Sequence, residues 1–147
     1  MFVRGMMVLA RERLVVLAEG APLIDAAKLF NEMDTDIVVV CAPDGRLAGV
    51  VTKTDVVLQI GRCGGSACKT RVSCVMTHDV LVCRDGEDLS LVWAEMKTRR
   101  LKNVPVVDDE SRPIGVLNAR DALQALLGEV ENEESLLRDY VMTVGYH

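Results

Sequence analysis

Short runs of hydrophobic residues alternate with amphipathic segments along most of the chain. Residues 14–17 and 37–41 are apolar runs of strand length, and the second is rich in β-branched side chains. Between them, residues 22–33 carry apolar side chains at helical spacing, behind a proline that suits a first helical turn. A Pro-Asp-Gly-Arg turn then precedes a third apolar run at 47–51. We therefore expect an antiparallel hairpin, followed by a helix through about Gln59.

The same order of elements occurs a second time, 66 residues further along the chain. Residues 80–83, 88–99, 104–107 and 114–117 repeat the order strand, helix, strand, strand. Each copy closes on a glycine, two apolar residues, a small polar residue and an aspartate three positions later: Gly49-Val50-Val51-Thr52-Lys53-Thr54-Asp55 and Gly115-Val116-Leu117-Asn118-Ala119-Arg120-Asp121. One such unit exposes too much apolar surface to fold alone, so two units should pack sheet against sheet. We predict an α/β (α+β) fold of two β-α-β-β-α repeats.

The composition between and after the repeats divides the chain further. We predict a first repeat at 1–60, a linker at 61–75, a second repeat at 76–127 and an acidic C-terminal segment at 128–147. The linker is rich in glycine and small residues and has no hydrophobic period. The last segment begins with four glutamates and continues into an apolar stretch, so we expect an amphipathic helix there.

Composition and charge limit the partners. Half of the residues are hydrophobic but only 3% are aromatic, so the core must be aliphatic. The net charge of −5 and the shortage of aromatic residues remove the basic surface and the stacking platforms that nucleic-acid binding uses. No apolar run is long enough for a signal-peptide core or a membrane span. We therefore expect a cytoplasmic protein with neither nucleic acid nor membrane as a partner.

The tandem units resemble a known family, the CBS-domain pair of the cystathionine-β-synthase type, and in particular its stand-alone bacterial members. The closing motifs carry the resemblance, together with the Asn-Val-Pro-Val-Val strand at 103–107 and the entry to the second repeat at 75–80. It covers roughly residues 10–127. It implies a pseudo-twofold homodimeric disc without catalytic activity. It also implies two clefts between the repeats that bind adenosine-containing ligands such as AMP, ADP, ATP or NAD. In that family the motif aspartate holds ribose hydroxyls, and the motif Ser or Thr lies near phosphate.

The two motif copies offer a ligand different chemistry. Thr52 and Asp55 fit a helix capping box, and the same helix N-terminus can also hold a phosphate. The second copy has Asn118 in place of the hydroxyl, but it carries Arg120 and follows a basic stretch at 99–102, which favours an anion. We therefore favour the cleft beside the second motif. With few aromatic residues available, the adenine is expected between aliphatic side chains. The predicted ligand-binding residues are Asp121, Arg120, Asn118, Asn103, Val104, Pro105, Val80, Thr52, Asp55 and Ile37, with Leu14 beside Ile37.

Two other interpretations stay open. Because Asn118 and Thr54 depart from the expected pattern, the pair could have lost its ligand and serve as a dimerisation or docking scaffold for an unknown protein target. Alternatively, Cys63, Cys68 and Cys74 could form a thiol or metal sensor, although they lack a tight Cys-x-x-Cys spacing. The other two cysteines, at 41 and 83, fall within predicted strands and are expected in the core. No Ser/His/Asp set is evident, so we predict no catalytic residues, no required cofactor and no metal.

Overall fold

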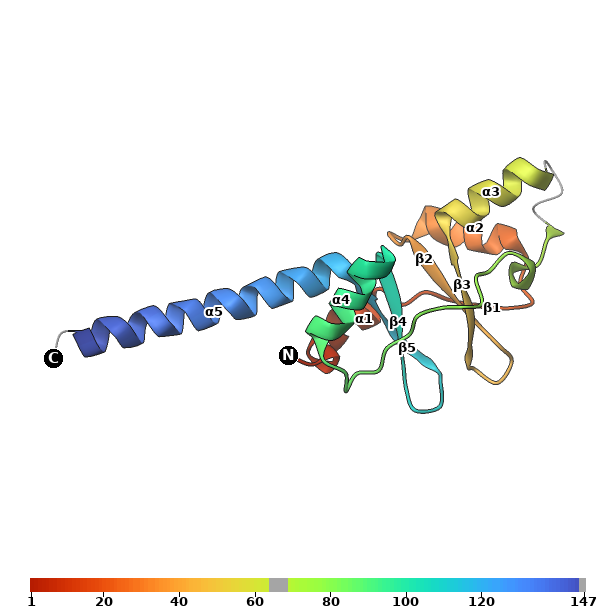
Figure 1. Cartoon of the computed structure of the whole chain (residues 1–147). Helices are drawn as coiled ribbons and strands as arrows, with labels where there is room; N and C mark the ends of the chain where they lie inside the picture. The colour runs from red at the N-terminus through yellow and green to blue at the C-terminus, as the bar shows by residue number, and fades with distance from the viewer. Residues whose placement is uncertain (64–68, 146–147) are drawn as a thin grey trace.

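The structure, a computed structural model, describes residues 1–63 and 69–145 (Figure 1). The elements follow in this order: a 3-10 helix η1 (Val3–Met6), α1 (Met7–Glu12), β1 (Val16–Ala18), α2 (Leu23–Glu32), β2 (Ile37–Cys41), β3 (Leu47–Thr52), α3 (Lys53–Cys63), a 3-10 helix η3 (Val72–Cys74), α4 (Leu89–Arg99), β4 (Asn103–Val107), β5 (Pro113–Asn118) and α5 (Ala119–Gly145). The predicted α/β (α+β) repeats are confirmed as two small sheets with helices against them.

Each sheet contains an antiparallel hairpin, but only the first sheet has a third strand beside it. In the first sheet, β2 pairs antiparallel with β3 and parallel with β1, in the order β1-β2-β3. In the second, β4 pairs antiparallel with β5, and the pairing shifts at the equivalent position in both hairpins. We expected a third strand at 80–83. Instead a single parallel bridge joins Cys83 to Val106, because Val80 and Leu81 leave the sheet to line a cavity.

The first strand is less buried than we expected. Val15 is buried, but Val16, the first residue of β1, is 46% exposed. As β1 lies at the edge of its sheet and pairs with β2 alone, its outer face has no neighbour to cover it.

The N-terminal segment belongs to the core of the second repeat, which the sequence did not predict. Val3, Met6, Met7 and Ala10 are buried together with apolar residues of α4, β4 and β5. Backbone hydrogen bonds from Val3 and Arg4 to the 85–87 loop fix this segment in place. The N-terminus of the chain therefore completes the repeat that lies furthest from it in sequence.

A third apolar cluster joins the two repeats. Ile37, Val39 and Val50 of the first sheet pack against Val116 of β5, and each of these residues is at most 8% exposed. The predicted packing of sheet against sheet is present, and every buried member of this cluster is aliphatic. This contact sets how the motif of one repeat lies against the loops of the other.

The last helix is longer than expected. We predicted a helix after Asn118 and a separate one after Gly128, but α5 is continuous from Ala119 to Gly145. Ala122 is fully buried against the body, whereas the described side chains beyond Gly128 are exposed. Figure 1 shows the C-terminal part of α5 extending away from the two repeats. A glycine inside a helix lowers its stability by about 1 kcal/mol but does not end it when the flanking residues favour helix.

The first residue of each motif lies where two backbones come close. A Cβ on Gly115 would be 2.9 Å from the Cβ and 3.0 Å from the carbonyl carbon of Ala10 in α1. A Cβ on Gly49 would be 2.5 Å from the carbonyl oxygen of Thr77, which pairs with Val50. In both repeats the glycine therefore lets the segment that enters the other repeat cross the hairpin at van der Waals distance.

We predict that Gly115→Ala lowers the free energy of unfolding by about 1–3 kcal/mol, because the added methyl must displace the α1 backbone. Gly128→Ala is the matched control. It adds the same methyl group in open space within α5 and should stabilise the protein by about 0.5–1 kcal/mol. Urea unfolding followed by circular dichroism measures both, and equal effects of the two substitutions would contradict the close packing.

Candidate ligand-binding clefts

A cavity of about 590 Å³ lies between the first motif and the entry to the second repeat. Its apolar wall is formed by Ile37, Val50, Val80, Leu81 and Leu101, which come from both repeats. Thr52, Thr54 and Thr77 add three hydroxyl groups, and Asn103 adds an amide. A ligand in this cavity would therefore contact both repeats at once.

Basic side chains outnumber acidic ones around this cavity. Four basic residues and two acidic residues line it: Lys53, Arg99, Arg100, Lys102, Asp36 and Asp79. Two of the cations are already paired, since Lys53 Nζ lies 3.4 Å from a carboxylate oxygen of Asp36 and Arg99 Nε lies 2.6 Å from Glu95. Among the residues that the structure describes, no carboxylate pairs with Arg100 or Lys102. These two cations remain available to an anionic ligand.

Arg100 is held in an unusual backbone conformation. It forms the C-terminal cap of α4 at φ 57°, ψ 40°, in the left-handed region that glycine normally occupies at this position. Its amide donates to the carbonyl of Lys97, so the conformation ends the helix. A side chain in this region raises the free energy of the fold by about 1 kcal/mol, and such strain is often found at functional sites.

The first motif forms the predicted capping box. The amide of Thr52 donates to Oδ2 of Asp55 at 2.9 Å, and the amide of Asp55 donates to the hydroxyl of Thr52 at 3.3 Å. Within residues 1–63 and 69–145, no hydrogen bond reaches the other oxygen of the Asp55 carboxylate. The first turn of α3 carries Lys53 and Thr54 beside the cavity, at the positive end of the helix dipole. Capping and ligand binding are compatible here.

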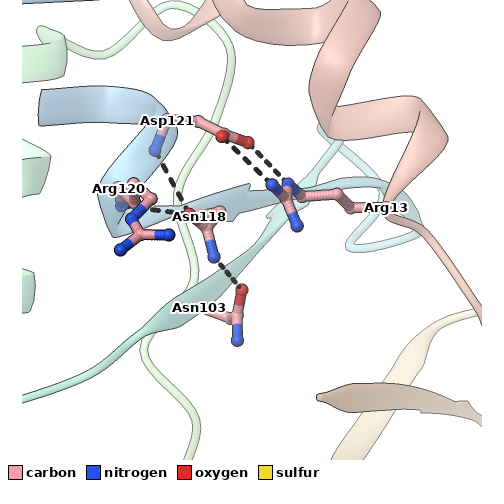
Figure 2. A network of polar contacts seen from close by, with 5 residues as sticks. All are labelled: Arg13, Asn103, Asn118, Arg120 and Asp121. Carbon is pink, nitrogen blue, oxygen red and sulfur yellow. Dashed lines mark hydrogen bonds and ion pairs between the residues drawn. The ribbon is translucent and has the colours of Figure 1, made fainter. Parts of the chain in front are cut away.

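The second motif uses its aspartate differently (Figure 2). Asn118 caps α5, since its Oδ1 accepts from the amides of Arg120 and Asp121, and its Nδ2 donates to Asn103 at 3.1 Å. The Asp121 carboxylate accepts from Arg13, with Nε at 2.5 Å and a terminal nitrogen at 3.0 Å. This hydrogen bond is the main reason that the pKa of Arg13 is raised. Both oxygens of Asp121 are therefore engaged by the residue that follows α1.

A smaller hollow of about 410 Å³ lies beside this ion pair. It is lined by Leu9, Glu12, Arg13, Val15, Glu32, Met33, Asp34 and Thr35. Three acidic residues face one arginine that is already paired, so the electrostatic environment opposes a phosphate. The residues around the two hollows thus differ in net charge. The 590 Å³ cavity has an excess of basic residues and is the more favourable for an anion.

The sequence grouped the basic stretch at 99–102 with the second motif. The structure places these residues around the cavity of the first motif, because the packing of the two sheets brings the end of α4 opposite Thr52 and Thr54. Of the predicted ligand-binding residues, Ile37, Thr52, Val80 and Asn103 line this cavity, and Asp55 caps the helix beside it.

The other predicted residues lie elsewhere. Val104 and Pro105 are buried in β4, Leu14 packs in the contact between the repeats, and Asn118, Arg120 and Asp121 do not line the cavity. The sequence analysis missed Arg13, Thr77 and Asp79. Arg13 and Asp79 lie 66 residues apart, at equivalent places in the two repeats, so the repeat offset was the signal that could have identified them.

The cysteines divide into buried and exposed residues. Cys83 is 2% exposed, and burial, with a smaller effect of Glu87, raises the pKa of its thiol to about 12. Cys41 is half-buried, which raises its pKa as well, and Cys74 is exposed. Cys68 and the Cys63 side chain lie outside the described part of the structure. Within the described residues, no group of three or more His, Cys, Asp or Glu side chains could hold a metal ion.

Comparison with known proteins identifies the family. A model of the CBS domain matches residues 6–62 and 72–128. The homoserine O-acetyltransferase of Methanohalophilus mahii is 28% identical over 118 residues, which is 80% of this chain but 23% of the transferase. The CBS domain pair of protein MJ0100, in complex with 5′-methylthioadenosine and S-adenosyl-L-methionine, has a TM-score of 0.74 at 20% identity, covering 88% of this chain and 98% of that one. CBSX2 in complex with AMP has a TM-score of 0.70 at 24% identity, covering 81% and 91%.

The chain belongs to the CBS-domain family and contains two CBS domains in tandem. The predicted resemblance to the CBS-domain pair and the predicted fold are therefore confirmed, whereas the stand-alone bacterial type stays a prediction. The chain spans less than a quarter of the length of the transferase it matches. No helix among the described residues is both long and apolar enough to cross a membrane.

We predict that Cys83 reacts far more slowly with a thiol reagent at pH 8 than Cys74. With a thiol pKa of about 12, Cys83 is protonated at that pH, and its burial also blocks access. Timed alkylation followed by mass spectrometry of the peptides measures each cysteine separately. Labelling in denaturant should abolish the difference, and equal rates in the native protein would contradict the burial of Cys83.

Proposed function

We propose that this tandem CBS pair is a non-catalytic regulatory module that binds a phosphorylated adenosine ligand in the 590 Å³ cavity beside Thr52. The observation that carries the proposal is the composition of that cavity. An apolar wall, hydroxyl groups, a helix N-terminus and two unpaired cations surround one space of a size that suits a nucleotide. AMP, ADP, ATP and NAD share the required chemistry.

Each part of such a ligand has a suitable environment. The adenine would lie against Ile37, Val80 and Leu101, since aliphatic side chains supply the apolar contact that aromatic stacking provides elsewhere. The ribose hydroxyls would donate to the free oxygen of Asp55. The phosphates would lie between the N-terminus of α3 and the cations of the opposite repeat, where the dipole and the charges act in the same direction.

Similarity to other CBS pairs supports an adenosine-containing ligand. The pair of MJ0100 was solved with 5′-methylthioadenosine and S-adenosyl-L-methionine, and CBSX2 was solved with AMP. S-adenosylmethionine carries a sulfonium cation, which Arg100 and Lys102 would repel. The charge of the cavity therefore favours the phosphate-bearing members of this ligand class.

Regulation would follow from the position of the cavity between the repeats. A ligand that contacts both repeats binds best in one relative arrangement of them, and so it shifts the population toward that arrangement. The Arg13–Asp121 ion pair occupies the equivalent place in the other half of the molecule, so we propose one ligand per chain. A protein target would respond to the arrangement of the repeats rather than to the ligand itself.

The first test measures ligand binding by thermal shift and calorimetry. A nucleotide at 100 times its dissociation constant should stabilise the protein by about 2.7 kcal/mol and raise the melting temperature by roughly 5–11 °C. We expect a response to ADP or ATP at one ligand per chain and a weaker response to adenosine.

Lys102→Ala should weaken ADP binding about threefold to tenfold without affecting adenosine. Arg84→Ala, which removes an exposed cation that does not line the cavity, is the control. A flat response to AMP, ADP, ATP, NAD and S-adenosylmethionine would exclude the proposed function.

The strained arginine provides a second test in which stability and binding change in opposite directions. Arg100→Gly should raise the free energy of unfolding by about 1 kcal/mol, because glycine adopts the left-handed conformation without a Cβ clash. The same substitution removes a cation and should weaken ADP binding. Arg100→Ala removes the cation but keeps the strain, so it should weaken binding without raising stability. If Arg100→Gly left ADP affinity unchanged, Arg100 would have no role in holding the phosphates.

A further inference from the structure

The part of α5 that leaves the body exposes large apolar side chains among the residues that the structure describes. Leu127 is 52% exposed, Val130 58% and Leu137 64%. From Gly128 to Gly145 the helix is 18 residues long, or about 27 Å at 1.5 Å per residue. Figure 1 shows that this part extends beyond the two repeats, so their surface does not cover it.

The apolar residues follow the spacing of a coiled coil. Successive steps of four and three residues connect the positions 123, 127, 130, 134, 137, 141 and 144, which are Leu, Leu, Val, Glu, Leu, Val and Val. A hydrophobic repeat of 3.5 residues is the pattern by which two helices pack side by side over about three heptads. We refer to these seven positions as the α5 stripe. Their spacing assigns them to one side of the helix, apart from Ala122, which packs against the body.

Charges beside the stripe fit a second copy of the same helix. In a parallel pair, Glu133 and Arg138 occupy flanking positions five residues apart, the separation at which a side chain of one helix meets that of the other. Two such ion pairs form in a symmetric dimer, one on each side. No other lysine or arginine occurs after Gly128, so Arg138 is the cation of this segment that can pair with a glutamate of a second copy.

Glu134 is the polar member of the stripe, and it already interacts with a neighbour. Its Oε1 accepts from a terminal nitrogen of Arg138 at 2.9 Å within the same helix. This contact partly neutralises Glu134 where two copies would bring it close to its counterpart. A single polar residue in such a seam lowers the stability of the pair but fixes the register of the two helices.

We propose that the α5 stripe is a self-association surface, and that two copies of this chain pair through parallel α5 helices. This inference is independent of the ligand in the cavity.

Sedimentation equilibrium and light scattering on the full chain test this proposal. Leu137→Asp places a charge on the stripe and should raise the dimer dissociation constant at least about tenfold. Leu136→Asp is the matched control. It changes the neighbouring leucine, which is 61% exposed against 64% but lies off the stripe, and should leave the dissociation constant within about twofold. Circular dichroism confirms that both variants remain folded.

A third variant should act in the opposite direction. Glu134→Leu replaces the polar member of the stripe and should tighten the dimer, because it completes the apolar seam. The proposal is overturned if the unmodified chain remains monomeric at high micromolar concentration. It is equally overturned if the dimer survives Leu137→Asp unchanged, since another surface would then hold it, or if Leu136→Asp dissociates it as much as Leu137→Asp.

Discussion

The aliphatic contact between the two sheets determines most of what this molecule can do. Val39 and Val50 of the first repeat pack against Val116 of the second, and the cavity opens at the edge of this contact. Neither repeat forms the cavity alone. The helix N-terminus with Thr52 and Thr54 comes from the first repeat, whereas Thr77 and the two cations that no described carboxylate pairs with come from the second. A small shift in the packing would separate these groups, so ligand affinity depends on a hydrophobic contact that the ligand itself does not complete.

The two repeats have the same order of elements, but the aspartate of the motif has different partners in each. In the first repeat Asp55 closes a capping box and keeps one oxygen that no described residue binds, whereas in the second Asp121 is held at both oxygens by Arg13. At the place equivalent to Arg13, the second repeat has Asp79, which lines the cavity of the first motif and, as a carboxylate, cannot form such a pair with Asp55. This difference in charge, arginine at one position and aspartate at the equivalent one, leaves the first motif accessible. The second motif is bound to Arg13 of the N-terminal segment.

The sequence predicted the fold more completely than the site. Repeated motifs, apolar runs and turn residues are local signals, and they located both hairpins, α2, α3 and α4 to within a few residues. The N-terminal helix was missed because its apolar run is short and its partners lie some 80–115 residues further along the chain. The basic residues at 99–102 were recognised as anion-binding candidates but grouped with the wrong motif, since only the packing of one sheet on the other shows which loop faces which helix. The pairing of Asp121 with Arg13 joins residues 108 positions apart, and no local pattern predicts it.

The position of α1 has a consequence for how the chain folds during synthesis. Val3, Met6, Met7 and Ala10 leave the ribosome before the first repeat, but the strands that bury them are made after it. The first repeat can form its hairpin and pack α2 and α3 while these apolar side chains still have no partner. Contacts of such high sequence separation slow folding, and exposed apolar segments favour aggregation while they wait. The second repeat thus becomes complete only when both ends of the pair are present, which makes the tandem, rather than the single CBS domain, the unit that folds.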